Sequence, residues 1–312
     1  MIEVAAGILT DAQGRVLLMQ RLPGKHLAGL WEFPGGKIEP GETVTQALVR
    51  ELDEELGVEV LDSTPLISIP WHYPEKSVRL HALRVTAWNG EPRAREGHPL
   101  RWVAVRDMGA AEMPAADAPI LAALRLPPYY IISKKGSESF LDRRADPGPA
   151  NPKNGSDPFF LVQLRMPGAA RDEVRRMAEH LIAMNPLSRE SLLVNHDIGL
   201  ARELGVGVHL RAAQLRELRE RPLPRAAWVG ASCHDAEELG MAARLGADFA
   251  TLSPVNVTAS HPEAAPLGWE RFAQLVEDAR LPVYALGGVG PDDLDRARAA
   301  GAQGVAGIRA FL

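Results

Sequence analysis

The chain has 312 residues, of which 46% are hydrophobic and 24% are charged, and its formal net charge is −5. This length suits two domains, and the acidic balance argues against a general attraction to nucleic-acid duplexes or anionic membranes. A single cysteine, Cys233, excludes an intramolecular disulfide and is typical of a reducing compartment. The sequence shows no basic signal-peptide region and no apolar run of membrane-spanning length, so we expect a cytoplasmic protein.

Apolar stretches separated by turn residues predict a mixed α+β sandwich, with helices packed on a sheet, in the first part of the chain. The expected strands cover residues 2–10, 15–20, 58–61, 66–73, 78–88 and 102–105. A short helix over residues 119–126 closes this part before Pro127 and Pro128. We therefore place the domain boundary after residue 127.

A loop rich in glycine and proline, residues 34–41, leads into an acidic helix. No continuous secondary structure is expected before Thr43, because glycine and proline interrupt regular elements. Thr43 and Gln46 have the spacing of a capping box, which predicts the start of the helix. Gly57 is a natural residue to end it.

Within this helix, Glu51, Glu54 and Glu55 stand at positions i, i+3 and i+4 and therefore share one face. Three neighbouring like charges destabilise a helix unless positive charge lies between them. Oxygen-only ligands suit a hard divalent cation, Mg²⁺ or Mn²⁺, that also holds substrate phosphates. A solvated acidic face is the alternative interpretation.

The spacing of this region resembles the signature of the Nudix hydrolases. Its fixed positions are filled by Gly36, Glu42, Arg50, Glu51, Leu52, Glu54, Glu55, Gly57 and Val58. Residues 28–42, 90–97 and 113–119 further resemble the MutT branch of that family. The resemblance implies a Nudix sandwich over residues 1–127 that hydrolyses purine nucleoside triphosphates, notably 8-oxo-dGTP, to the monophosphate and pyrophosphate. It also implies Mg²⁺ as the cofactor, with Mn²⁺ as an alternative.

The same resemblance implies roles for single residues. The metal ligands would be the carbonyl of Gly35 and the carboxylates of Glu51, Glu54, Glu55 and Glu96. Glu51, Glu54 and Glu96 are the expected catalytic residues, with Glu51 binding metal or deprotonating water. The expected substrate contacts are Arg21, His26, Phe33, Lys37, Tyr73 and Asp117. Arg50 and Glu42 are expected to form a structural ion pair that holds the loop on the helix.

Asp117 departs from the MutT branch that this chain resembles. That branch has an asparagine at this position, and the asparagine recognises the hydrogen-bonding edge of the purine base. An amide donates and accepts hydrogen bonds, whereas an ionised carboxylate only accepts them. The carboxylate is expected to pair with the N1–H and amino groups of guanine and to leave unread the N7–H that marks the oxidised base. The substitution Asp117→Asn is then expected to change the selectivity between 8-oxo-dGTP and dGTP. Capping of the following helix is the alternative role.

From residue 128 onward, strand and helix patterns alternate, which predicts a (β/α)8 TIM barrel over residues 128–312. Residues 134–158 are rich in glycine, proline and polar residues, and irregular structure is expected there. The expected strands are residues 130–132, 160–164, 192–195, 207–210, 228–231, 249–253, 283–286 and 304–307. The expected helices are residues 172–184, 198–204, 212–220, 236–245, 269–279 and 292–300.

This half is similar to the thiamine phosphate synthase and TenI barrels, among other places at residues 162–165, 229–234 and 285–289. The resemblance implies a phosphate site after the seventh and eighth strands, for a phosphorylated thiamine-related molecule. The residues expected to form it are Gly287, Gly288, Gly307 and Arg309. Tight turns are the alternative reason for these glycines.

The synthase chemistry is expected to be lost, because charge is missing where the synthases need it. Pro167 and His261 stand in place of lysines, and His196 stands in place of a magnesium-binding aspartate. His209 and His234 are expected to be packing or turn histidines. The barrel is then a ligand-sensing or scaffold module. In the alternative interpretation both halves serve thiamine metabolism, and the Nudix half hydrolyses a compound similar to thiamine diphosphate.

Overall fold

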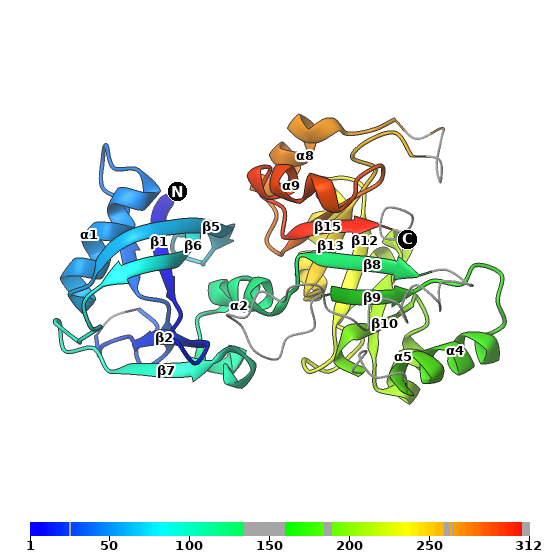
Figure 1. Cartoon of the computed structure of the whole chain (residues 1–312), viewed down its shortest axis with the longest axis horizontal. Helices are drawn as coiled ribbons and strands as arrows, with labels where there is room; N and C mark the ends of the chain where they lie inside the picture. Colours follow the sequence, from blue (N-terminus) through cyan, green and yellow to red (C-terminus); the bar gives the residue numbers. More distant parts are fainter. Residues whose placement is uncertain (25, 134–159, 184–188, 259–262, 264, 308–312) are drawn as a thin grey trace. The chain divides into compact units, whose positions relative to one another are not determined.

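The computed structural model describes residues 1–24, 26–133, 160–183, 189–258, 263 and 265–307 (Figure 1). These residues divide into two compact units, of which the first covers Met1–Arg125 and the second begins at Leu126. The expectations for residues 134–158, His261 and Arg309 fall outside the described residues. Every helix in the described part is too short or too polar to cross a membrane.

The first unit contains two sheets. One has the order β4-β1-β6-β5 and consists of β1 (Ile2–Leu9), β4 (Gly35–Lys37), β5 (Glu59–His72) and β6 (Ser77–Asn89). The other has the order β3-β2-β7 and consists of β2 (Arg15–Gln20), β3 (Trp31–Glu32) and β7 (Leu100–Ala104). β1 and β6 are parallel neighbours, and the other pairs of strands are antiparallel.

Two details of the predicted strand pattern are wrong. β5 continues through Pro65 where the sequence predicts a break, because shifts in register along its pairing with β6 absorb the extra residues. β4 forms inside the loop where no regular structure is expected. Gly35 allows this pairing, since a Cβ atom there would lie 2.1 Å from the carbonyl oxygen of Ala5 on β1.

Two helices cover the first sheet from opposite faces. α1 (Val44–Leu56) buries its leucines in a core that includes Leu9 of β1. α2 (Ala118–Arg125) buries Ile120 in a second core that includes Ile8 of β1. Because side chains alternate along a strand, Ile8 and Leu9 point to different faces of the sheet. The predicted α+β sandwich is confirmed.

The second unit is a closed barrel of parallel strands in the order β10-β11-β12-β13-β14-β15-β8-β9 (Figure 1). Its strands are β8 (Tyr129–Ser133), β9 (Phe160–Leu164), β10 (Leu192–Asn195), β11 (Gly207–Leu210), β12 (Val229–Cys233), β13 (Phe249–Leu252), β14 (Val283–Leu286) and β15 (Gly304–Gly307). Its described helices are α4 (Arg171–Ala183), α5 (Ile198–Leu204), α6 (Ala212–Glu217), α7 (Ala236–Leu245), α8 (Gly268–Glu277) and α9 (Leu294–Ala299). The predicted (β/α)8 barrel is confirmed.

Three aromatic rings fill the interior of the barrel at the end where its strands begin. Tyr130, Phe249 and Tyr284 are fully buried, and their ring centroids lie 5.0 to 5.7 Å apart. The hydroxyl of Tyr284 donates a hydrogen bond of 2.5 Å to the carbonyl of Pro127, just before the first barrel strand. Gly230 leaves room for this packing, because a Cβ atom there would lie 2.5 Å from the Phe249 ring. The packed rings close one end of the barrel and leave the other end for a site.

A buried ion pair joins the starts of two neighbouring barrel strands. Arg221 and Asp248 are 10% and 14% exposed, and a guanidinium nitrogen lies 2.7 Å from the Asp248 carboxylate. The same carboxylate accepts a hydrogen bond from the N–H of Val229, and Arg221 also donates to the carbonyls of Ala227 and Gly246. Burial raises the pKa of Asp248, and the charge of Arg221 opposes that rise. The pair is structural, since it lies at the strand starts.

Candidate active site

The acidic helix α1 starts and ends as the sequence predicts. The Thr43 hydroxyl accepts a hydrogen bond from the N–H of Gln46, and the Gln46 side chain accepts one from the N–H of Thr43, at 3.2 and 2.8 Å. Gly57 follows the helix with a φ of 70°, and its N–H bonds to carbonyls of the last turn. Both ends of the helix are thus fixed, which determines where its glutamates point.

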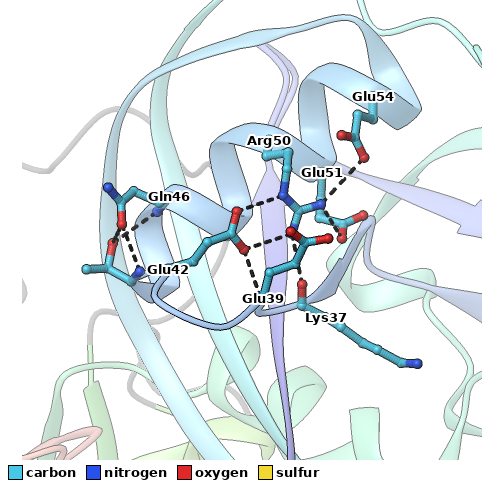
Figure 2. Close-up of polar contacts among 8 residues, drawn as sticks. Lys37, Glu39, Glu42, Gln46, Arg50, Glu51 and Glu54 are labelled. Carbon is cyan, nitrogen blue, oxygen red and sulfur yellow. Dashed lines mark hydrogen bonds and ion pairs between the residues drawn. The ribbon is translucent and has the colours of Figure 1, made fainter.

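Arg50 lies at the centre of the polar contacts on this helix (Figure 2). Its guanidinium donates to both carboxylate oxygens of Glu42, at 2.8 and 2.9 Å, and to the carbonyl of Lys37, whose side chain points away from the network. It also donates to Glu51 at 2.8 Å and approaches Glu54 at 3.5 Å. The hydrogen bond from Arg50 lowers the pKa of Glu42 to about 2. The predicted ion pair is confirmed, and Arg50 supplies positive charge among the glutamates.

The three glutamates of α1 lie in different surroundings. The carboxylate of Glu51 packs over Gly36, where a Cβ atom would lie 2.2 Å from the carboxyl carbon. Glu55 turns toward the same loop and accepts a hydrogen bond of 2.9 Å from the N–H of Gly35. Glu54 is 55% exposed. Glu51 and Glu55 therefore face the Gly35–Gly36 backbone, whereas Glu54 lies in solvent.

Negative charge is concentrated around Glu55. Burial raises its pKa to about 8, the Gly35 hydrogen bond lowers it, and the charges of Glu51, Glu32 and Glu96 raise it further. A set of oxygen donors with this excess of negative charge fits a hard divalent cation. Among the described residues, however, no three His, Cys, Asp or Glu side chains form a ready-made metal-ligand cluster. The exact ligand set stays a prediction.

Glu96 is carried by a segment tied to the end of α1. The N–H groups of Arg93 and Arg95 donate to the carbonyls of the last two residues of α1, at 2.9 and 3.0 Å. The Arg95 guanidinium lies against Gly57, where a Cβ atom would lie 2.4 Å from its Nε. Glu96 itself is 56% exposed and lies 3.5 Å from the Nε2 atom of His98. The segment thus places Glu96 near enough to α1 for its charge to raise the pKa of Glu55.

Several expected substrate contacts lie close together near β3 and the end of β5. Arg21 forms an ion pair with Glu32 and donates a hydrogen bond of 2.6 Å to the carbonyl of His26. The His26 ring meets the Tyr73 ring edge-on, with centroids 5.3 Å apart. Phe33 is buried in the same core as α2 and is only 4% exposed. The structure thus brings Arg21, His26 and Tyr73 together and places Phe33 beneath the surface.

Asp117 ends a 3-10 turn immediately before α2, and it is 6% exposed. Among the described residues its Oδ2 atom has no hydrogen-bond partner, and no side-chain bond joins it to α2. The capping alternative is therefore not seen. Burial raises the pKa of Asp117 well above its usual value, Glu32 raises it further and Arg21 opposes the rise. The surroundings thus disfavour the ionised form that the sequence analysis assumes.

Glu32 is a residue of this region that the sequence analysis misses. It is 22% exposed and paired with Arg21, and burial raises its pKa in spite of that pairing. Its charge acts on both Glu55 and Asp117, so it links the acidic helix to the expected base pocket electrostatically. The available signal was a charged residue between two aromatic residues, Trp31 and Phe33.

The second unit has a cavity of about 1050 Å³ at the carboxyl ends of its strands. Of the described residues that line it, Asp197 is the only one with a carboxylate, and this carboxylate accepts a hydrogen bond of 2.9 Å from Arg171. Arg165 and Arg211 also line the cavity, and within the described chain neither forms an ion pair. The cavity is therefore suited to an anionic ligand.

The glycines of the predicted phosphate site lie at this cavity. Gly287, Gly288 and Gly307 all line it, and the first two have φ values of 93° and 64°. A Cβ atom on Gly287 would lie 2.8 Å from Pro254, and one on Gly288 would lie 2.5 Å from the carbonyl oxygen of Val257. Local packing alone thus requires glycine at both positions. Phosphate binding stays a prediction.

Two histidines of the cavity wall are already engaged. His209 is fully buried, and its ring nitrogens bond to the hydroxyls of Tyr130 and Ser232 at 2.9 and 3.0 Å. Burial lowers the pKa of His209 to about 3, so the ring is neutral. The Nδ1 atom of His234 bonds to the buried carboxylate of Glu238 at 2.8 Å. These contacts agree with packing and turn roles, although both residues also border the cavity.

Comparison with known proteins assigns each unit to a family. The NUDIX domain matches residues 5–123, and the thiamine monophosphate synthase family matches residues 156–311. An 8-oxo-dGTP diphosphatase of Haemophilus influenzae is 41% identical over 123 residues, which are 39% of this chain and 90% of the relative. A CTP pyrophosphohydrolase of Escherichia coli has the same identity and coverage.

The barrel has a relative of comparable similarity. A protein of Aquifex aeolicus is 35% identical over 193 residues. Its name, thiamine-phosphate synthase 2, is provisional. These residues make up 61% of this chain and all of the relative. The chain therefore belongs to the Nudix family through its first unit and to the thiamine monophosphate synthase family through its second.

Proposed function

We propose that the first unit is a Mg²⁺-dependent pyrophosphohydrolase of purine nucleoside triphosphates, with 8-oxo-dGTP as its foremost substrate. The observation that carries the proposal is the approach of Glu51 and Glu55 to the Gly35–Gly36 backbone, together with the effect of the Glu96 charge on the pKa of Glu55. In this proposal the Gly35 carbonyl and the carboxylates of Glu51, Glu54, Glu55 and Glu96 hold the cation. When bound, the cation would neutralise charge on the phosphate oxygens.

The residues of the chain would supply the remaining chemistry. Water attacks a phosphorus atom of the triphosphate, a phosphoanhydride bond breaks to give the monophosphate and pyrophosphate, and a nearby carboxylate accepts the proton of the water. Glu51 suits this role, because Arg50 occupies only its Oε1 atom and leaves Oε2 for the proton. Arg21 would contact the phosphates, which requires it to exchange the Glu32 carboxylate for a phosphate oxygen. Tyr73 and Phe33 would border the base.

The identity of the base is the open part of this proposal, because an 8-oxo-dGTP diphosphatase and a CTP pyrophosphohydrolase match the chain equally well. Pyrophosphate release from 8-oxo-dGTP, dGTP, CTP and thiamine diphosphate, with and without EDTA, tests it. We expect the highest kcat/KM for 8-oxo-dGTP and no turnover in EDTA. Preferred hydrolysis of CTP would overturn the purine assignment. Preferred hydrolysis of thiamine diphosphate would instead support the alternative in which both units serve thiamine metabolism, an alternative favoured by the family of the barrel.

For the second unit we infer a binding site for a phosphorylated, thiamine-related small molecule, without synthesis of thiamine phosphate. The cavity supports anion binding, as do the charges of Arg165 and Arg211, which form no ion pair with any residue that the structure describes. His196 and the pairing of Asp197 with Arg171 support the loss of the synthase reaction, because the described lining then offers no free carboxylate for magnesium. Calorimetric titration with thiamine phosphate and inorganic phosphate, in EDTA, tests this inference. Arg165→Met should weaken binding, and unchanged affinity would contradict it.

A further inference from the structure

His98 is a buried histidine next to Glu96, and the proposed chemistry of the first unit does not yet use it. It is 9% exposed and lies two residues before β7. The Nδ1 atom of its ring lies 3.0 Å from the carbonyl oxygen of Gln20, the last residue of β2. The N–H of Gln20 in turn donates a hydrogen bond of 2.9 Å to the carbonyl of Pro99. These two bonds fix the ring against the end of β2.

The contact with Gln20 determines which ring nitrogen carries a proton. A carbonyl oxygen only accepts hydrogen bonds, so Nδ1 is the donor, and in the neutral ring Nε2 then has a lone pair and no proton. This Nε2 atom lies 3.5 Å from a carboxylate oxygen of Glu96, and neither of these two atoms can donate to the other. Within the described chain no hydrogen bond reaches Nε2.

Two acceptors that face each other need a positive group between them. Histidines that bind metal ions are oriented in the way that is seen for His98: one ring nitrogen donates to a carbonyl or carboxylate, and the other faces the metal. Glu96 is already an expected ligand of a divalent cation. A metal ion therefore accounts for both contacts of the ring. A proton shared between His98 and Glu96 is the alternative.

We propose that the Nε2 atom of His98 is a ligand of the cation that Glu96 holds, so that the metal site contains nitrogen as well as oxygen. The inference rests on the proposed function of the first unit, which requires this cation. At metal–ligand distances of about 2.1 Å, adjacent ligands of an octahedral cation lie about 3 Å apart, which is close to the observed 3.5 Å. Since the described residues hold no ready-made cluster of three such side chains, the cation would draw in Glu96, which is 56% exposed.

The charges around His98 agree with a cation at this position. Burial raises the pKa of Glu32, whereas the charge of Arg21 and a charge on His98 lower it. Burial likewise raises the pKa of Glu55, and the charges of Glu32 and Glu96 raise it further. His98 thus belongs to one group of interacting side chains that has more carboxylates than cations.

A nitrogen ligand changes which cations the site favours. Oxygen ligands suit Mg²⁺, whereas imidazole suits first-row transition metals such as Fe²⁺, Co²⁺ and Zn²⁺. The first unit is therefore expected to prefer Co²⁺ over Mg²⁺ by a wider margin than an oxygen-only site would. Mg²⁺ would still be held by the carboxylates and would still support hydrolysis.

Electron spin echo measurements on the full chain, loaded with less than one equivalent of Mn²⁺, test the ligand directly. A coordinated imidazole nitrogen modulates the echo of Mn²⁺, and we expect this modulation in wild type. Labelling only the histidines with nitrogen-15 should change it, which identifies a histidine without any mutation. Glu55→Gln should abolish it, because this variant removes a carboxylate of the site. Bound Mn²⁺ without nitrogen modulation, or modulation that survives in Glu55→Gln, would overturn the proposal.

His98→Gln separates a metal ligand from a structural residue. Glutamine keeps a donor for the Gln20 carbonyl and offers only oxygen to the metal. The variant should lose the nitrogen modulation and at least about tenfold in Co²⁺ affinity by calorimetry, while its Mg²⁺ affinity changes less than about threefold. His81→Gln is the matched control, because His81 bonds to Glu3 and Ser68, which are not expected ligands, and it should behave as wild type.

Two outcomes for His98→Gln would overturn the proposal. Nitrogen modulation that persists would place the coordinating histidine elsewhere, and equal losses of Co²⁺ and Mg²⁺ affinity would show a merely structural role. Nitrogen-15 NMR of wild type decides the alternative, since a ring that keeps both protons after addition of Zn²⁺ would show a shared proton and no metal bond. Nitrogen coordination without hydrolysis of any nucleotide would keep this inference and refute the proposed function. Metal-dependent hydrolysis without nitrogen coordination would do the reverse.

Discussion

Replacing Glu55 with glutamine separates the cost of burying this carboxylate from its expected use as a metal ligand. Glutamine keeps the size of the side chain and an oxygen that accepts the hydrogen bond from Gly35. It removes the ionisable group, whose pKa in the folded chain is raised from 4.5 to about 8, mainly by burial. The variant is therefore expected to be more stable than wild type in the absence of metal, and less active in its presence.

The size of the stability change follows from the two pKa values. Between pH 4.5 and pH 8 the unfolded chain has released the Glu55 proton while the folded chain retains it. Each pH unit in this window destabilises folded wild type by about 1.4 kcal/mol, so the cost at pH 7 is about 3 kcal/mol. Glu55→Gln escapes this cost, which corresponds to a Tm increase of roughly 10 °C for a domain of this size. Below pH 4.5 the difference should disappear.

Scanning calorimetry in EDTA at several pH values measures this difference, and hydrogen exchange of α1 identifies the transition of the first unit. Addition of Mg²⁺ should then stabilise wild type more than Glu55→Gln, and pyrophosphate release by the variant should fall at least a hundredfold. Glu54→Gln is the matched control, because Glu54 is an expected ligand that is 55% exposed. Its metal-free stability should stay unchanged while its activity falls. Wild-type turnover in either variant, or no stability gain for Glu55→Gln at pH 7, would refute the reasoning.

Three further predictions concern the loop, the barrel reaction and the barrel wall. Gly36→Ala should abolish pyrophosphate release, because the new Cβ atom would displace the Glu51 carboxylate. Circular dichroism should show little loss of secondary structure, and near-normal turnover would contradict this prediction. Purified protein given both thiamine precursors and Mg²⁺ should form no thiamine phosphate above a no-enzyme control, since His196 cannot replace a carboxylate that binds metal. Clear turnover would show an intact synthase. Arg221→Met should destabilise the barrel by about 3 to 5 kcal/mol in denaturant titrations, because it leaves the Asp248 carboxylate buried without a counter-charge; a loss below about 1 kcal/mol would show that water reaches that carboxylate.

The sequence predicts those features of the fold that depend on local chemistry. Thr43, Gln46 and Gly57 define the ends of α1 because capping bonds join residues close in the chain. The pair of Arg50 and Glu42 is also predictable, because its members belong to one signature. The barrel strands follow from repeated short apolar runs bounded by turns, and the closed parallel order then follows from their number.

The features that the sequence misses depend on contacts between distant segments. β4 forms because Gly35 fits against the backbone of β1, and no local pattern announces that approach. Glu32 and Asp117 come under each other's charge only after β3 and the turn before α2 are packed in one core. The rise in the pKa of Asp117 depends on this packing, so an argument from the residue type alone cannot foresee it.

The contact between Arg95 and Gly57 has a consequence for how this domain can change during evolution. The glycine of the signature ends α1, and its bare backbone also accommodates a guanidinium group from the segment that carries Glu96. A side chain at residue 57 would therefore displace the segment that carries the Glu96 carboxylate, without touching the glutamates of α1. Insertions and deletions are tolerated in most surface loops, but between residues 90 and 95 they would shift Glu96 out of register with α1. Transplanting the signature helix alone into another protein would leave this carboxylate behind.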